Sequence, residues 1–106
     1  MPRGHVRYAA SEERHWNSLQ ITKQVQTLVV TVDGRWTEEE IAQTVNFKDN
    51  LSWDQGAKRR LRDLVNDTFG VGLTAAAVIA AKTVADVQKL IEDALTAQGR
   101  MVIAHE

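Results

Sequence analysis

The residue types that could do chemistry gather between positions 52 and 62 of the chain. Ser52 offers a hydroxyl, Asp54 a carboxylate and Gln55 a carboxamide, and a basic run follows them, Lys58-Arg59-Arg60-Leu61-Arg62. Such a run can dock on an acidic protein surface, bind a nucleic-acid backbone or remain a solvated helix face. We therefore look first for a binding role at this segment.

The sequence lacks the residue sets of common catalytic and metal sites. The chain contains no cysteine, which excludes disulfides, thiolate metal sites and a cysteine nucleophile. His5, His15 and His105 are scattered, without the spacing of metal ligands or of a Ser-His-Asp set. The three glutamates at 38–40 are better explained by a helix start than by acid–base catalysis. We therefore expect neither an enzyme nor a metal site.

Length and composition are those of one small globular domain. The chain has 106 residues, 43% hydrophobic and 25% charged, with a net charge of −1. This balance disfavours nucleic acid as the partner of the basic run, because phosphate-binding surfaces are usually net basic and carry stacking aromatics. The apolar stretch 73–81 is too short to span a bilayer, and the first residues lack the apolar core of a signal peptide. We expect a cytoplasmic protein that does not contact a membrane.

The first third of the chain contains one long helical pattern. Residues 1–10 show no period and are expected to form a flexible tail. Ser11 can cap a helix that starts there and ends at Asp33-Gly34. The β-branched run 28–32 also suits a strand, but the apolar stripe extends upstream and no partner strand is visible. The residues on the apolar face of this helix are Ile21, Val25, Leu28, Val29 and Val32.

Two capping signatures predict the next helix starts. Thr37 with Glu40 has the form of a capping box, preceded by Trp36 as a hydrophobic staple, and predicts a short turn. Ser52 with Gln55 has the same form and predicts that a longer helix starts with Ser52 as its cap.

The remaining pattern completes an all-α bundle. The longer helix ends at Gly70, a short buried helix is expected over 74–81, and a last helix runs from Thr83 to Gly99. The core-facing residues of the two longer helices are Leu61, Leu64, Val65, Thr68, Phe69, Val87, Leu90, Ile91 and Leu95. We therefore predict a helical domain over 11–99, with three main helices and one short helix, followed by a C-terminal tail over 100–106.

The order and spacing of these parts resemble the acyl carrier protein family. That family has a long first helix, a loop with a phenylalanine and a leucine, an Asp-Ser-Leu motif opening the second helix, a short third helix and a Thr-Val-led fourth. Over residues of about 20 to 97 the matching positions are Phe47, Leu51, Asp54, Leu61, Leu64, Phe69, Leu73, Thr83, Val84, Val87 and Ile91. The resemblance implies an acyl-carrier-like four-helix bundle.

Two departures from the family pattern change the expected function. The family's motif serine carries phosphopantetheine through a phosphodiester, and its place is taken here by Gln55, a carboxamide without a nucleophilic hydroxyl. The next position, usually leucine, is Gly56. The family's second helix is acidic and docks on basic enzyme surfaces, whereas the matching surface here is cationic and would repel them. Together, the resemblance and these departures imply an acyl-carrier-like bundle that lacks the family's prosthetic group.

We predict a non-catalytic protein-interaction or regulatory module that holds no cofactor. Its basic second helix would bind an acidic surface of a partner protein, such as a biosynthetic enzyme, with Trp53 as an anchor. The predicted contact residues are Trp53, Asp54, Lys58, Arg59, Arg60 and Arg62. One alternative is a specialised carrier of lipid or polyketide biosynthesis, with phosphopantetheine at an atypical hydroxyl such as Ser52 or Thr68. A third reading is a small nucleic-acid-binding domain.

Overall fold

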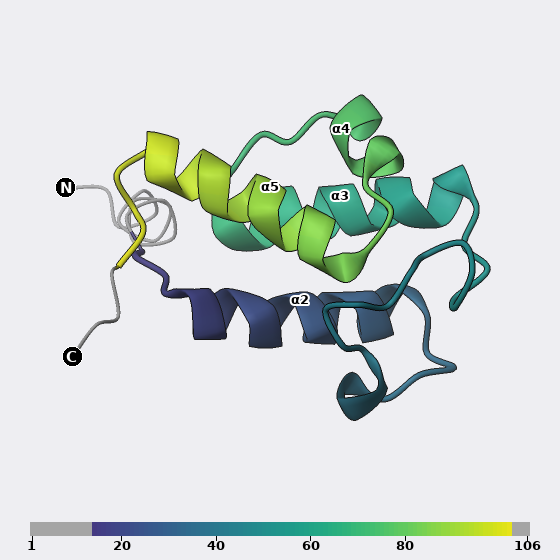
Figure 1. The fold of residues 1–106 in the computed structure, drawn as a ribbon. Helices are drawn as coiled ribbons and strands as arrows, with labels where there is room; N and C mark the ends of the chain where they lie inside the picture. Colours follow the sequence, from purple (N-terminus) through teal and green to yellow (C-terminus); the bar gives the residue numbers. More distant parts are fainter. Residues whose placement is uncertain (1–13, 103–106) are drawn as a thin grey trace, which may run out of the picture.

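The protein is a small bundle of helices, seen in a computed structural model that describes residues 14–102 (Figure 1). Within that range the elements are α2 (Ser18–Val32), the 3₁₀ turn η1 (Glu38–Glu40), α3 (Gln55–Phe69), α4 (Ala75–Ala80) and α5 (Val84–Ala97). The same residues contain no named β-strand, only two isolated bridges. For residues 14–102, the prediction of an all-α fold with three main helices and one short helix is confirmed.

The core lies between α2, α3 and α5, which contact one another pairwise. Each helix buries residues spaced by three or four positions, as the sequence pattern predicted. The buried residues of these helices include Ile21, Val25, Leu28, Val29, Ala57, Leu61, Val65, Phe69, Val84, Val87, Ile91 and Leu95. Four residues predicted to face the core are only partly buried: Val32, Leu64, Thr68 and Leu90.

The first described helix starts later than the sequence predicted. Asn17 caps α2: its Oδ1 accepts from the Gln20 N–H at 2.8 Å, and the Asn17 N–H donates to Gln20 Oε1 at 3.0 Å. Residues 14–17 are not helical, so the prediction of a helix running through them from Ser11 is wrong. Ser11 itself lies outside the described residues. The helix starts at Ser18 because the reciprocal pair of Asn17 and Gln20 satisfies free amides at its N-terminus.

The residues before α2 pack against those after α5. The Trp16 N–H donates to the Arg100 carbonyl at 2.9 Å, and the Val102 N–H donates to the Trp16 carbonyl at 2.7 Å. The Trp16 ring is buried, with its centroid 4.5 Å from that of Phe69. Arg100 is also buried. The segment 100–102, which the sequence assigned to a tail, is therefore part of the packed structure.

The short helix α4 lies against α3 (Figure 1). Thr74 caps it, with the hydroxyl accepting from the Ala77 N–H at 3.1 Å. Only Val78 of its six residues is buried, so the prediction of a buried helix is wrong for most of its residues. No helix within residues 14–102 has the length and apolar character needed to cross a membrane.

The long loop between η1 and α3 is fixed to the start of α5 by backbone hydrogen bonds. Phe47 N–H donates to the Lys82 carbonyl at 3.0 Å, and Val84 N–H donates to the Val45 carbonyl at 3.0 Å. Phe47 and Leu51, the loop's phenylalanine and leucine, are both buried and pack into the core. This loop ends at α3 and thereby sets where the basic helix starts.

Candidate interaction site at the start of α3

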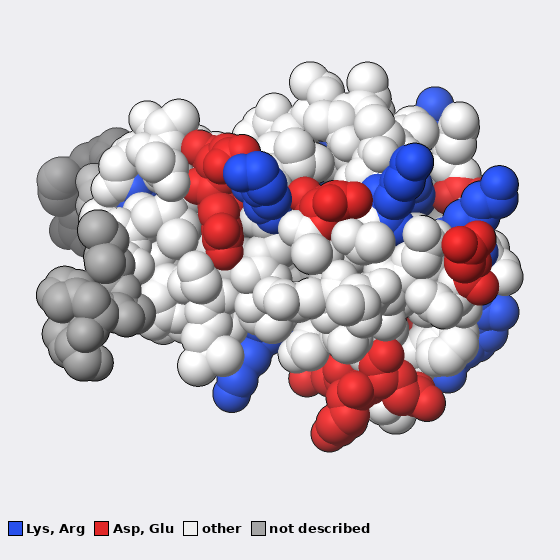
Figure 2. Space-filling model, viewed as in Figure 1, with Lys and Arg blue, Asp and Glu red and all other residues white. Residues whose placement is uncertain are grey.

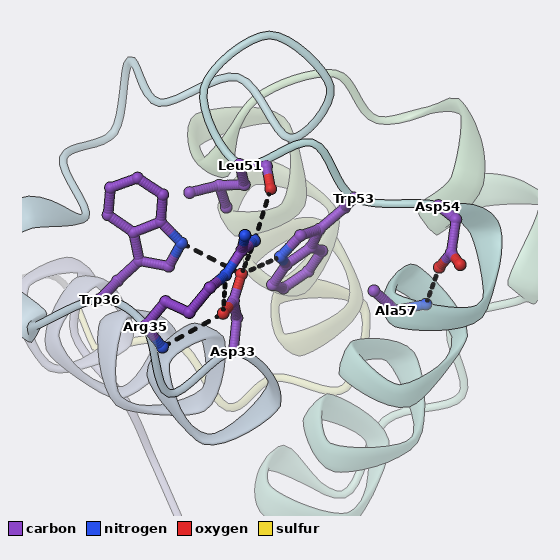
Figure 3. A network of polar contacts seen from close by, with 7 residues as sticks. All are labelled: Asp33, Arg35, Trp36, Leu51, Trp53, Asp54 and Ala57. Atoms are coloured by element: carbon purple, nitrogen blue, oxygen red, sulfur yellow. Dashed lines mark hydrogen bonds and ion pairs between the residues drawn. The ribbon is translucent and has the colours of Figure 1, made fainter.

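Asp54, and not Ser52, caps α3. The Asp54 Oδ1 accepts from the Ala57 N–H at 2.9 Å (Figure 3). Ser52 has a φ of 58°, in the left-handed region, whereas a capping residue needs extended backbone. The predicted Ser52–Gln55 capping box is therefore wrong, and Gln55 is the first residue of the helix.

Gln55 lies exposed in the first turn of α3. In the pattern of the acyl carrier protein family, which the chain resembles, this position matches the serine that carries the prosthetic group. Its carboxamide has no hydroxyl that could form a phosphodiester, so the residue present does not fit phosphopantetheine. Ser52 is exposed but lies before the helix. A methyl group added to Gly56 would lie 3.4 Å from Asp54 Oδ1, which is an ordinary contact. Lack of space for a side chain therefore does not explain why the residue at position 56 is glycine.

Lys58 is half-buried, and its ammonium is bound by groups of the fold. Its ammonium donates to the carbonyls of Ile79 at 2.8 Å and Ala81 at 2.7 Å, at the end of α4. The ammonium also lies 5.5 Å from the Phe47 ring centroid. Partial burial lowers the pKa of this lysine by desolvation. Lys58 therefore joins α3 to α4, and we leave it out of the contact surface.

Replacing Lys58 with methionine is expected to lower the free energy of unfolding by roughly 1–3 kcal/mol, because the two carbonyls at the end of α4 lose their charged donor. Methionine keeps an unbranched side chain, so packing changes little. Urea unfolding followed by circular dichroism measures the effect. Lys48→Met, at an exposed loop lysine, is the control. Equal stability of the two variants would contradict this role.

Arg59 and Arg60 are the two cations of the run that point to solvent. Both are exposed, and neither forms an ion pair with another residue of the range 14–102. Arg62 is half-buried, and its Nε lies 2.7 Å from an Asp63 carboxylate oxygen. The free positive charge of α3 is therefore concentrated at Arg59 and Arg60.

Trp53 is half-buried and not an exposed anchor. Its ring stacks on Phe47, with centroids 5.1 Å apart and an interplanar angle of 22°. Its Nε1 donates to Asp33 Oδ2 at 2.9 Å. Both contacts hold the indole against the loop, so Trp53 positions the residues before α3.

Asp33 is the centre of a polar network that the sequence patterns did not reveal (Figure 3). Its carboxylate accepts from Arg35 Nε at 2.9 Å, Arg35 Nη2 at 2.7 Å, Trp36 Nε1 at 3.0 Å and Trp53 Nε1 at 2.9 Å. The same Arg35 Nη2 also donates to the Leu51 carbonyl. The Arg35 guanidinium, followed by the indole N–H groups, holds the pKa of the Asp33 carboxyl well below its usual range. The sequence predicted only that a helix ends at this aspartate.

Two other charged surfaces lie over η1 and along α5. Exposed glutamates at 38–40 form the acidic patch over η1, and charges of both signs alternate along α5 (Figure 2). Within residues 14–102 no group of three or more His, Cys, Asp or Glu side chains is arranged to hold a metal ion. At the start of α3, Arg59 and Arg60 are consecutive, exposed and without an ion pair within residues 14–102.

Comparison with known proteins does not assign the chain to a family. No protein-family model and no curated protein sequence matches it.

Proposed function

We propose that this chain is an acyl-carrier-like domain without a prosthetic group that acts as a non-catalytic protein-interaction or regulatory module. It binds an acidic surface of a partner protein, such as a biosynthetic enzyme, through the first half of α3. The observation that carries the proposal is the pair of exposed guanidiniums, Arg59 and Arg60, that have no ion-pair partner within the described chain.

The order of charges along α3 supports a binding role. Its basic residues lie in the first half and Asp63 and Asp67 in the second, with no acid in the first turn and no base in the last. A helix dipole favours the opposite order, by about 0.3–1 kcal/mol per charge near a helix end. Arg59 and Arg60 lie beyond the first turn, where this effect has fallen off, so the dipole does not account for their position and leaves them available to a partner.

The residue at the start of α3 supports a module that carries no cargo. Gln55 is exposed where the resembling family needs a nucleophilic serine, and its carboxamide cannot replace that hydroxyl. Asp63 and Asp67, which share the exposed side of the same helix, would repel nucleic-acid phosphates.

Charge reversal of the two arginines is expected to abolish partner capture. The full chain is immobilised, and proteins captured from native lysate of the source cell are quantified for the wild type, Arg59→Glu/Arg60→Glu and Lys23→Glu/Lys89→Glu. The control pair reverses two exposed lysines on α2 and α5. We expect the arginine variant to lose specific partners by about tenfold or more, as for hot-spot residues, and the lysine variant to keep them. A captured set that is the same for all three would refute binding through this surface.

A further inference from the structure

A groove between α2 and α3 is lined by Arg60, one of the two free arginines, and Arg59 precedes it on the same helix. It has a volume of about 350 Å³ and is lined by Thr31, Val32, Arg60, Asp63 and Leu64. Val32 and Leu64 form its apolar floor and are only partly buried by the core. This volume is at the lower end of the roughly 300–1,000 Å³ of small-molecule pockets. It suits one bulky apolar side chain better than a complete cofactor.

A second hollow continues the groove towards the start of α3. It measures about 250 Å³ and shares Val32 and Arg60 with the first. Its remaining lining residues are Asp33, Arg35, Ser52, Trp53, Asp54 and Ala57. Arg60 therefore stands between an apolar hollow and a polar one.

The charges around the groove leave an excess of cations. Asp33 is paired with Arg35, Asp63 with Arg62, and Asp54 caps the start of α3. Once these carboxylates are occupied, the guanidiniums of Arg59 and Arg60 remain without a partner in the range 14–102. A ligand that enters beside them gains most from carboxylates next to its apolar group.

The comparable groove between α4 and α5 lacks this feature. It has a volume of about 300 Å³ and lies between Ala80, Leu90 and three charged residues. Those charges are occupied, since Asp86 accepts from the amides of Lys82 and Thr83 and Lys89 lies 3.7 Å from Asp93. No free charge there selects a ligand, so this groove serves as a matched control.

We infer that the α2–α3 groove binds an acidic segment of the partner protein, with one bulky apolar side chain on Val32 and Leu64 and carboxylates on Arg60 and Arg59. This inference rests on the proposed function and adds the chemistry of the partner. An apolar anchor in a groove supplies most of the affinity, and the flanking charges orient the segment and exclude basic sequences.

Peptide display on the full chain tests this inference directly. One library places a short randomised stretch between aspartates and glutamates, and a second places it between lysines and arginines. We expect enrichment from the acidic library alone, with Leu, Ile, Met, Phe or Trp at one position. Affinities of selected peptides are then measured by fluorescence anisotropy. Thr31→Trp, which fills the groove from an exposed position, and Arg60→Ala should each weaken binding by about tenfold or more.

The α4–α5 groove supplies the matched controls. Ala80→Trp fills it from an exposed position, Lys89→Ala removes its lysine, and both should bind the peptides as the wild type does.

Enrichment of basic or purely polar peptides, or equal binding to Thr31→Trp and wild type, would overturn the inference. If peptide affinity depends on Arg59 and Arg60 but is unchanged in Thr31→Trp, the groove is not the binding site, and the proposed function is retained. Peptides that bind Arg59→Glu/Arg60→Glu at wild-type strength would count against both. If a DNA or RNA oligonucleotide binds the wild type and Thr31→Trp weakens that binding, the groove is a nucleic-acid site and the inference is overturned.

Discussion

Replacing Asp33 with alanine is expected to lower the free energy of unfolding by roughly 3 kcal/mol, the upper end for hydrogen bonds to a charged group. The substitution leaves the Arg35 guanidinium and the N–H groups of Trp36 and Trp53 without their common acceptor. Arg35 is itself largely exposed, and its ion pair alone contributes little. Most of the loss comes from the two half-buried indoles, which must find water or remain unpaired.

The pH dependence of this variant separates the carboxylate from general packing. The folded pKa of Asp33 is lowered, so its contribution to stability is fully present above the ordinary aspartate pKa of about 3.9. The contribution is lost as the pH falls below that value towards the folded pKa, because the unfolded chain then binds more protons. The difference between wild type and Asp33→Ala should therefore be constant near neutral pH and shrink progressively below about pH 4.

Urea unfolding at several pH values measures this difference, with tryptophan fluorescence as the signal. Asp49→Ala, at an exposed aspartate of the loop between η1 and α3, is the control and should match the wild type at every pH. A constant difference down to the lowest pH at which the protein folds would mean that Asp33 acts through shape alone.

A serine at position 55 should convert the chain from unmodified to largely modified by a promiscuous phosphopantetheinyl transferase. The variant is Gln55→Ser combined with Arg59→Glu and Arg60→Glu, since carrier-loading enzymes of the resembling family dock on an acidic second helix. Position 55 is exposed in the first turn of α3, so a hydroxyl there is accessible. Intact mass after incubation with coenzyme A should increase by one phosphopantetheine group, whereas the wild type should not change.

Gln55→Ala in the same charge-reversed background is the matched control, and circular dichroism checks that each variant keeps its helices. If the serine variant gains no mass, the resemblance to acyl carriers does not extend to the surface that the transferase reads. If the wild type itself gains the mass, the protein is a carrier with an atypical hydroxyl. Ser52→Ala and Thr68→Ala would then locate the attachment.

The helices and their buried faces were predictable because they depend on short-range pattern. Leu61, Val65 and Phe69 repeat every four residues, and this spacing places them on one side of any helix that contains them. The glycine at position 70 predicted where α3 ends, because glycine adopts the left-handed conformation of a helix end without strain. The structure has this conformation there, with a φ of 68°. Neither inference requires knowledge of what lies opposite the helix.

The start of α3 was not predictable in the same way. Ser52 and Asp54 are both good capping residues and lie two positions apart, so local preference does not choose between them. The choice depends on Trp53, whose ring stacks on Phe47 and whose N–H reaches Asp33. These contacts span 6 and 20 residues of the chain and arise only when the loop closes on the end of α2.

The basic run shows most clearly which properties of the site follow from the sequence and which follow from the tertiary structure. The sequence alone determined the composition of the run, its location on a helix and the absence of a hydroxyl at Gln55, since these follow from residue type and short-range spacing. Only the tertiary structure separated Lys58 from Arg59 and Arg60. The end of α4 lies beside α3, and its carbonyls draw the Lys58 ammonium into the fold while the two arginines point to solvent. The physical reason is that the carbonyls which bind that charge belong to a segment more than 20 residues away.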